Sequence, residues 1–171
     1  MNDPQSLAAA IDAADWSAFR VLPAYIDGNG HMNVGYYAVL FDQALDIPWK
    51  LLGIDYSLID RENKSSFALE SHYTYRREVR EGDALAFTFR LLDFDAKRVH
   101  YFMTMQHAAE GWMAATSEQI SMCVDMGSRR GTNWPADVTA RLEGLLPLYR
   151  ARPGPPEVGR LIGIRRRTGA G

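Results

Sequence analysis

The sequence predicts an α+β domain in which one long helix packs against an antiparallel sheet. Residues 34 to 46 repeat apolar side chains at three- and four-residue steps, which gives a helix with one broad apolar face. Four strand-like runs follow it at the spacing of an antiparallel meander. A turn rich in Gly and Asn, residues 27 to 33, stands directly before the helix. Such a helix needs a sheet to cover its apolar face.

Shorter elements surround this helix. Residues 4 to 14 are alanine-rich and predict a short helix, and residues 17 to 26 predict a first strand in which Pro23 indicates an edge or an irregularity. Pro48 is expected to break or redirect the long helix, and residues 54 to 64 are expected to form a polar connection. The four later strands are expected at about 66 to 79, 83 to 93, 97 to 108 and 112 to 125.

The expected organisation has four parts. They are an N-terminal segment (1 to 16), a main domain (17 to 127), a C-terminal helix (128 to 150, with its helical pattern at 135 to 149) and a flexible basic tail (151 to 171). Apolar residues within 158 to 164 also allow a short strand in this tail. The 171 residues are enough for one domain with a real core.

Composition excludes several classes of protein. A net charge of −2 argues against a nucleic-acid binder. The single cysteine, Cys123, has no partner for an internal disulfide, which fits a reducing cytoplasm. No apolar run is long enough to span a membrane, and the first residues lack the pattern of a signal peptide. The four histidines are scattered, so no metal site is expected.

The turn before the helix has the residue types of a catalytic site. Gly28 and Gly30 let the backbone approach a ligand, and Asn33 is a suitable N-cap for a helix that starts at Val34. The first N–H groups of that helix then point back toward Asp27. A carboxylate that faces such donors across a ligand gap suits acyl transfer, because the amides stabilise a developing oxyanion.

These residues resemble the signature of hotdog-fold acyl-CoA thioesterases of the 4-hydroxybenzoyl-CoA thioesterase type, which have a D-x-x-G-H-x-N pattern before the central helix. A closer resemblance is to the betainyl-CoA thioesterases of carnitine breakdown, which share D-x-N-G-H-M-N. The segments that support this second resemblance, besides residues 27 to 33, are Ser71–Tyr75, Leu92–Arg98 and Ala115–Gln119. The resemblance covers roughly residues 17 to 127. It implies a hotdog fold, in which the sheet curls around the long helix.

The resemblance also implies roles for the turn. Asp27 would act as general base or nucleophile, the backbone N–H of Val34 would hold the oxyanion, and His31 and Asn29 would assist. Each residue also has a structural interpretation. Asp27 can close its own turn, Asn29 can cap that turn, and His31 can serve the turn's structure alone. Asp42, on the central helix, is the rival base, because a related group of thioesterases places its catalytic acid there.

Further residues are candidates for substrate contact. Those expected to bind the acyl part are Gly30, Asn33, Tyr37, His72, Trp112 and Glu118. Glu118 also fits a structural partner of a histidine or arginine, because a carboxylate on an apolar strand face needs a partner. The expected contacts of the CoA phosphates are Arg76, Arg77, Lys97 and Arg98. Aromatic rings would recognise a quaternary ammonium acyl group such as betainyl by cation–π attraction.

The leading hypothesis is therefore a cytoplasmic hydrolase that cleaves a small acyl-CoA without a metal or redox cofactor, with betainyl-CoA as the specific candidate. The resemblance further implies a homodimer or homotetramer with the site between subunits. A hotdog hydratase is one alternative, although its D-x-N-P-x-H pattern has Pro where this chain has Gly30, and His31 comes one residue early. The other alternative is a module that binds acyl-CoA without turnover.

Overall fold

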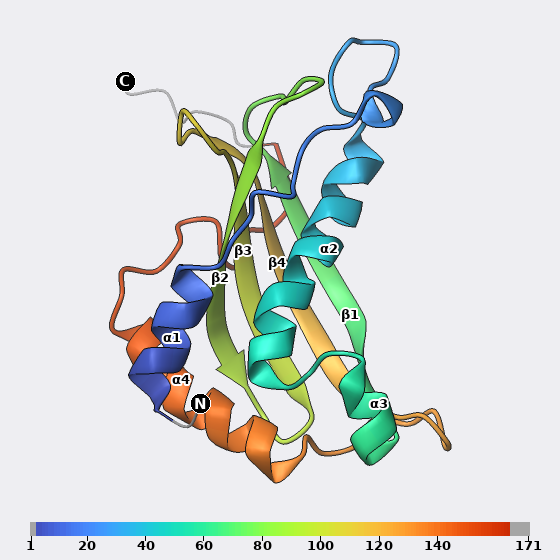
Figure 1. Ribbon diagram of the computed structural model, residues 1–171, viewed down its shortest axis with the longest axis vertical. Coiled ribbons are helices and arrows are strands. Elements are labelled where there is room, and N and C mark those ends of the chain that lie inside the picture. The colour runs from blue at the N-terminus through green and yellow to red at the C-terminus, as the bar shows by residue number, and fades with distance from the viewer. Residues whose placement is uncertain (1–2, 165–171) are drawn as a thin grey trace.

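A long helix lies against a four-stranded antiparallel sheet (Figure 1). The computed structural model describes residues 3–164. The helix, α2, spans Val34–Leu52. In sheet order, the strands are β1 (Lys64–Tyr75), β4 (Met113–Asp125), β3 (Arg98–His107) and β2 (Leu85–Phe94). The predicted α+β architecture with one long helix is confirmed.

The ends of α2 follow from two residues. The side chain of Asn33 caps the N-terminus by accepting a hydrogen bond from the Gly35 N–H at 3.0 Å, as its position predicts. Gly53 ends the helix in the left-handed conformation, with φ 77°. Of the two outcomes expected at Pro48, a break does not occur, because α2 continues through this residue to Leu52 and ends at Gly53. Pro48 lies in the last turns and is buried there, so packing offsets the one backbone hydrogen bond that it removes.

The two faces of the sheet differ in what covers them. The face toward α2 is apolar and aromatic: Trp49 of α2 packs edge-on against Tyr101 with ring centroids 4.9 Å apart, and Phe41 packs against Phe87 at 5.7 Å. The opposite face, called the outer face below, includes Glu118 and Thr116 in alternation with the residues that face α2. This alternation is the two-residue period of a strand.

Two short helices complete the core. α1 (Pro4–Asp12) packs against α4 (Ala136–Arg150), and α4 in turn lies beside β2 (Figure 1). Both were expected from the sequence. The helix α3 (Ser57–Glu62) was not, because residues 54 to 64 were predicted to be a polar connection. Its one buried side chain, Leu58, gives too weak a periodic signal to reveal a six-residue helix.

The predicted strand at 17 to 26 is also wrong. This stretch contains a 3-10 turn, Pro23–Tyr25, and pairs with other segments only through isolated bridges, Arg20 with Ala84 and Ile26 with Met32. Pro23 begins the turn, because its fixed φ suits a helical turn and its missing N–H cannot join a ladder. The segment still connects α1 to the turn before α2.

After α4 the chain crosses the outer face as the C-terminal strap, residues 151–160. The guanidinium of Arg90 on β2 donates hydrogen bonds to the carbonyl oxygens of Tyr149 and Arg152, both at 2.6 Å, and to that of Pro153. Farther on, the Gly159 N–H donates to Oε2 of Glu118 on β4 at 2.8 Å. Residues 158 to 164 form no strand, so that expectation is wrong. Residues 165 to 171 of the expected tail lie outside the described residues.

Candidate active site

The turn of residues 27–33 is a compact loop closed by its own backbone. Ile26 and Met32 form a β-bridge at its base. Within it, the Asp27 N–H donates to the His31 carbonyl oxygen and the Gly30 N–H donates to the Asp27 carbonyl oxygen, both at 3.0 Å. Gly30 has φ 79°, a conformation that side-chain-bearing residues rarely adopt. The glycine is therefore needed at this position of the turn.

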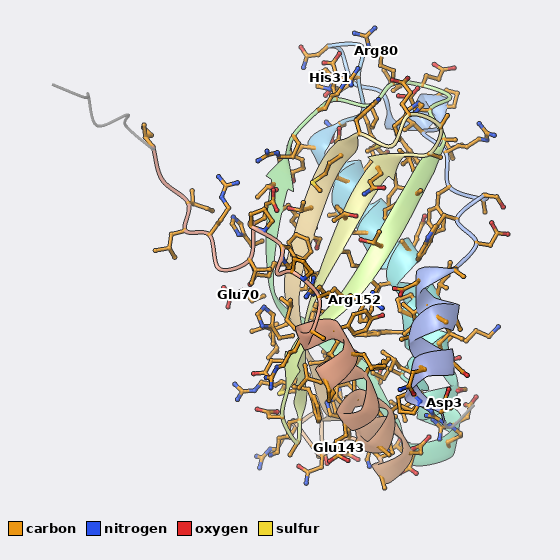
Figure 2. The ribbon with its side chains drawn as sticks, turned by 90° about the vertical axis from the view of Figure 1, so that its left-hand side faces the viewer. Asp3, His31, Glu70, Arg80, Glu143 and Arg152 are labelled. Carbon is orange, nitrogen blue, oxygen red and sulfur yellow. The ribbon has the colours of Figure 1, made fainter. Side chains whose placement is uncertain are left out.

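The turn is anchored to the rest of the domain on two sides. The Met32 N–H donates to the Val79 carbonyl oxygen and the Asn33 N–H donates to the Tyr25 carbonyl oxygen, both at 2.9 Å. Met32 itself is buried in the core. Figure 2 shows His31 and Arg80 at the same end of the molecule, where the segment after β1 backs the turn. These anchors hold the turn at the N-terminus of α2.

Asp27 and the first residue of α2 each keep a polar group without a hydrogen-bond partner among residues 3–164. One Asp27 carboxylate oxygen accepts a hydrogen bond from the Asn29 N–H at 2.8 Å, so this residue does close its turn. Its other oxygen accepts none among the described residues. The Asn33 side chain accepts from the Gly35 N–H and not from Val34. The N–H of Val34 has no protein acceptor in residues 3–164. A helix N-terminus adds partial positive charge at that amide.

Aromatic rings flank the turn. Tyr25 stacks on Tyr36, with ring centroids 4.3 Å apart, and the buried Tyr37 meets Tyr75 edge-on at 5.1 Å. Burial raises the pKa of the Tyr37 hydroxyl above its usual value, which keeps this side chain neutral. His31 is half-buried, and its Nδ1 lies 3.3 Å from the Met32 carbonyl oxygen. His31 therefore lies within the turn and Tyr37 lies one turn into α2, and their expected roles in substrate contact stay predictions.

Other predicted substrate residues lie elsewhere in the chain. Glu118 and His72 are paired across β4 and β1 on the outer face, and Glu118 Oε1 lies 2.9 Å from His100 Nε2. Glu118 thus has the structural histidine partner that was one of its two interpretations. Trp112 sits before β4 between two flat groups, the Arg77 guanidinium at 4.1 Å and the His107 ring at 5.0 Å.

The predicted CoA contacts fall at opposite ends of the sheet. Arg76 and Arg77 follow β1, at the end where the turn is anchored. Lys97 and Arg98 form the β2–β3 connection at the other end, about 30 Å away for strands of this length. Arg98 is paired there with Asp95 at 2.6 Å. Within one chain, the two pairs of cations are therefore too far apart to bind one phosphate.

The structure also shows a small hollow that sequence reasoning missed. It measures about 100 Å³ and lies between α2 and the neighbouring strands, with Asp42, Asp46, Asp55 and Tyr101 in its lining. Partial burial raises the pKa of Asp46, and the charges of Asp42 and Asp55 raise it further. The signal in the sequence was the spacing of Asp42 and Asp46, one turn apart on a mostly apolar helix.

Metal sites and membrane-spanning helices are both absent from residues 3–164. Across residues 3–164, no group of three or more His, Cys, Asp or Glu side chains is arranged to hold a metal ion. No helix in the same range has the length and apolar character that crossing a membrane requires.

Comparison with known proteins identifies the family. Residues 21–142 match the model of the thioesterase-like superfamily. The chain is 35% identical to a betainyl-CoA thioesterase of Pseudomonas aeruginosa over 84% of this chain and 91% of that protein. It is 33% identical to an L-carnitine dehydrogenase/betainyl-CoA thioesterase of Rhizobium meliloti, over 86% of this chain but only 29% of that longer protein.

A solved structure agrees with these sequence matches. A hypothetical protein of Staphylococcus aureus, crystallised in complex with CoA, is 26% identical and superposes with a TM-score of 0.79, covering 86% of this chain and 92% of the other. The predicted hotdog fold and the predicted reaction class are confirmed by these relatives. This chain is therefore an acyl-CoA thioesterase, and it belongs to the thioesterase-like superfamily.

Proposed function

We propose that this thioesterase hydrolyses betainyl-CoA to betaine and CoA at the turn of residues 27–33. The observation that supports the site is that one Asp27 carboxylate oxygen and the Val34 N–H at the helix N-terminus, at either end of the same turn, both lack a hydrogen-bond partner among residues 3–164. The support for the substrate is the name shared by the Pseudomonas and Rhizobium relatives. The turn, Asp27 to Asn33, contributes the carboxylate, and Val34 directly after it contributes the proposed oxyanion donor.

In the proposed mechanism, Asp27 uses its unbonded carboxylate oxygen to activate water or to attack the thioester carbonyl itself. The Val34 N–H stabilises the oxyanion that develops, because a fixed donor at a helix N-terminus needs no reorganisation. His31 and Asn29 hold the turn and approach the substrate from its exposed side, with Gly30 and Asn33 lining the same loop. Asp42 is about 12 Å farther along α2 from Val34, too far to act with that amide.

The chemistry of betainyl-CoA restricts where its charge can bind. One methylene separates the trimethylammonium group from the reacting carbonyl, so the cation must lie within a few ångströms of Asp27 and Val34. The rings in that region are the stacked Tyr25 and Tyr36, with Tyr37 beside them. Their faces would attract the cation, which supports these tyrosines over Trp112 as the acyl-binding aromatics.

The CoA part is proposed to extend from the site along the end of the sheet where the turn of residues 27–33 is anchored. Arg76 and Arg77 are placed there, and stacking on Trp112 holds the Arg77 guanidinium flat. Arg76 is half-exposed and 3.8 Å from the buried Glu157 of the strap. Lys97 and Arg98 would reach a phosphate only from another subunit, since they lie at the opposite end.

A homodimer through β1 is part of the proposal. β1 is the outermost strand of the sheet next to β4, and it leaves a row of backbone groups on its other side without a strand. Apolar side chains are exposed along the same side: Leu69 and Tyr75 on β1, and Val34 and Val39 on α2. Antiparallel pairing of two β1 strands would cover both features and bring a second chain next to Tyr75, near the turn.

The test is thiol release from betainyl-, acetyl-, benzoyl- and longer-chain acyl-CoAs. Asp27→Asn is expected to lower kcat by at least ~100-fold while the protein stays folded, since loss of a base or nucleophile has that size. Asp42→Asn, the same substitution at an aspartate of α2, is the matched control and should retain turnover. Near-normal turnover by Asp27→Asn would move the catalytic role to Asp42 or Glu118. Binding of acyl-CoA without any thiol release would contradict the thioesterase itself.

The choice of acyl group has its own test. Wild type should prefer betainyl-CoA over acetyl-CoA in kcat/KM by at least ~10-fold, which corresponds to a cation–π attraction in a desolvated site. Tyr36→Leu should reduce this preference while acetyl-CoA hydrolysis is retained. The exposed Tyr56, away from the turn, provides the control substitution Tyr56→Leu. An equal rate for both thioesters in wild type would rule out betainyl as the selected group.

A further inference from the structure

A hollow of about 450 Å³ lies on the outer face of the sheet, beside the end of the C-terminal strap. Ile120 of β4 lies in its floor, and Leu161 and Ile162, directly after the strap, form one wall. Figure 2 shows Glu70 of β1 beside this part of the chain. Pockets that bind small molecules have about this volume, so the hollow has room for a ligand between the sheet and the chain's own segment.

The hollow and the proposed reaction site are in different places. Glu70 stands five residues before the end of β1 at Tyr75, which is about 17 Å along a strand. The turn of residues 27–33 is anchored beyond that end, at Val79, and none of its residues lines the hollow. A ligand in the hollow would therefore not contact Asp27.

Two opposite charges line the hollow, and neither has a partner among residues 3–164. Glu70 is exposed, and its carboxylate forms no ion pair or hydrogen bond in that range. Arg160 likewise forms no ion pair there, and its Nε is buried without a hydrogen-bond partner. A buried donor without an acceptor costs free energy. Arg160 therefore calls for a ligand with an acceptor, and Glu70 can attract a cation.

The other acid in the lining, Glu118, is already engaged. Its Oε1 lies 2.9 Å from His100 Nε2, and its Oε2 accepts a hydrogen bond from the Gly159 N–H at 2.8 Å. His72 stands opposite Glu118 in the register of β1 and β4, and its ring makes no hydrogen bond within the described chain. The groups of the lining left for a ligand are therefore one carboxylate, Glu70, and two donors, Arg160 and His72.

We propose that this outer-face hollow binds a small zwitterion that carries a carboxylate and a quaternary ammonium group. The carboxylate pairs with Arg160, and the cation lies over Ile120 toward Glu70. The methyl groups of a quaternary ammonium need no acceptors and pack against aliphatic side chains. A primary ammonium has three N–H donors to satisfy, and in this lining only the carboxylate of Glu70 is free to accept from them.

Betaine, the product of the proposed reaction, belongs to this class of zwitterion, and in naming it the inference rests on the proposed function. Product bound in the hollow would stay away from the reacting turn. It would join the segment that carries Arg160 to β1. Leu161 and Ile162 are 90% and 91% exposed, so their backbone N–H groups should exchange more slowly with solvent once the ligand holds the segment.

The first test is isothermal titration calorimetry of betaine into the full chain. Arg160→Gln and Glu70→Gln should each raise the Kd by at least ~10-fold, because each removes one charge-assisted contact with the ligand. Arg129→Gln and Glu143→Gln make the same substitutions at exposed residues outside the hollow, and they should leave the Kd unchanged. No binding by wild type, or an unchanged Kd in Arg160→Gln and Glu70→Gln, would overturn the inference.

The second test varies the charges of the ligand at constant shape. In 3,3-dimethylbutanoate a carbon atom replaces the nitrogen of betaine, and choline retains the cation without the carboxylate. Each should bind at least ~10-fold more weakly than betaine, since each loses one of the two charge contacts. Hydrogen exchange at Leu161 and Ile162 should slow with betaine in wild type and not in Arg160→Gln. Affinity equal to that of betaine for either analogue would overturn the proposed pairing.

A third variant separates the inference from the proposed function. Tyr36→Leu alters the aromatic rings beside the turn and should leave betaine binding at the hollow unchanged. Betaine binding that is lost in Tyr36→Leu and kept in Arg160→Gln would place betaine at the turn and overturn the inference. Thiol release should stay within about twofold of wild type in Arg160→Gln and Glu70→Gln. Absence of betainyl-CoA hydrolysis would refute the proposed substrate, while the titrations would still test the hollow.

Discussion

The turn of residues 27–33 and the C-terminal strap are both irregular segments, but they are held in different ways. The turn is closed by hydrogen bonds between backbone groups a few residues apart, such as Asp27 with His31, and it depends on the positive φ of Gly30. The strap is held by side chains of distant strands, Arg90 and Glu118. The conformation of the turn is therefore determined by its own residues, whereas the conformation of the strap depends on the sheet that it packs against.

This difference has a functional consequence. The backbone hydrogen bonds that anchor the turn go to Val79 and Tyr25 and not to the strap, so the proposed reaction site and the cover of the outer face are held by separate contacts. Substitutions that release the strap should therefore change stability or assembly and spare chemistry. Substitutions in the turn should change chemistry more than stability.

The largest expected effect on stability is that of Arg90→Leu. Arg90 donates to the carbonyl oxygens of Arg152 and Pro153 in the strap and to that of Tyr149 at the end of α4, and charge-assisted hydrogen bonds that are partly buried contribute more than neutral ones. The free energy of unfolding should fall by about 3 kcal/mol, measured by urea denaturation. At concentrations where the protein is dimeric, kcat should stay within about twofold of wild type, given the separate contacts of the turn and the strap.

The control is Arg98→Leu, which removes an exposed arginine paired only with Asp95 and should cost less than about 1 kcal/mol. Loss of turnover in Arg90→Leu, at a dimeric concentration and with the fold intact, would show that the strap and the turn are coupled.

The two glycines of the turn provide a matched pair. Gly30→Ala forces φ 79° on a residue with a Cβ and should cost about 1 to 2 kcal/mol of stability. It should also lower kcat/KM by ~10-fold or more, since a displaced Asp27 and His31 lose their alignment. Gly28→Ala meets no atom within 4 Å and has no positive φ, so it should be tolerated. Equal effects of both substitutions would mean that backbone conformation is not what the turn requires.

The contrast also explains what the sequence reveals. The turn, its N-cap Asn33 and the long helix were predictable, because each depends on residues close in sequence. The strap was not predictable, because the sequence of residues 151–160 contains no signal that Arg90, about 60 residues earlier, binds their carbonyl oxygens. Glu118 illustrates the same limit. The alternation of apolar and polar residues in its strand indicated a carboxylate that needs a partner, but only the folded sheet shows that His100 and Gly159 are its partners.

Glu118→Gln sharpens this interpretation. The amide still accepts one hydrogen bond, so the expected cost is about 1 kcal/mol, together with faster hydrogen exchange at the Gly159 N–H that Glu118 holds. Turnover of acyl-CoA should be unchanged, because Glu118 lies on the outer face beneath the strap. A rise in KM with the Gly159 amide still protected would instead restore the prediction that Glu118 contacts substrate.

The smallest expected effect is a pH-dependent one at the β2–β3 connection, far from both the turn and the strap. Hydrogen bonds from the Arg98 side chain, and then from the backbone N–H groups of Lys97 and Arg98, lower the pKa of Asp95 to about 2. Its pKa in the unfolded chain is about 3.9, so Asp95 stabilises the fold above that pH and loses this contribution as pH falls toward 2.

Because the Asp95 side chain is 46% exposed, solvent screening reduces the contribution to about 0.5 kcal/mol. Urea denaturation should show this difference between wild type and Asp95→Asn at pH 6, and the difference should shrink at pH 3 and in 1 M salt. A difference that is constant over this pH range would assign the effect to hydrogen bonds in the β2–β3 connection that the asparagine amide fails to reproduce, and not to the charge of Asp95.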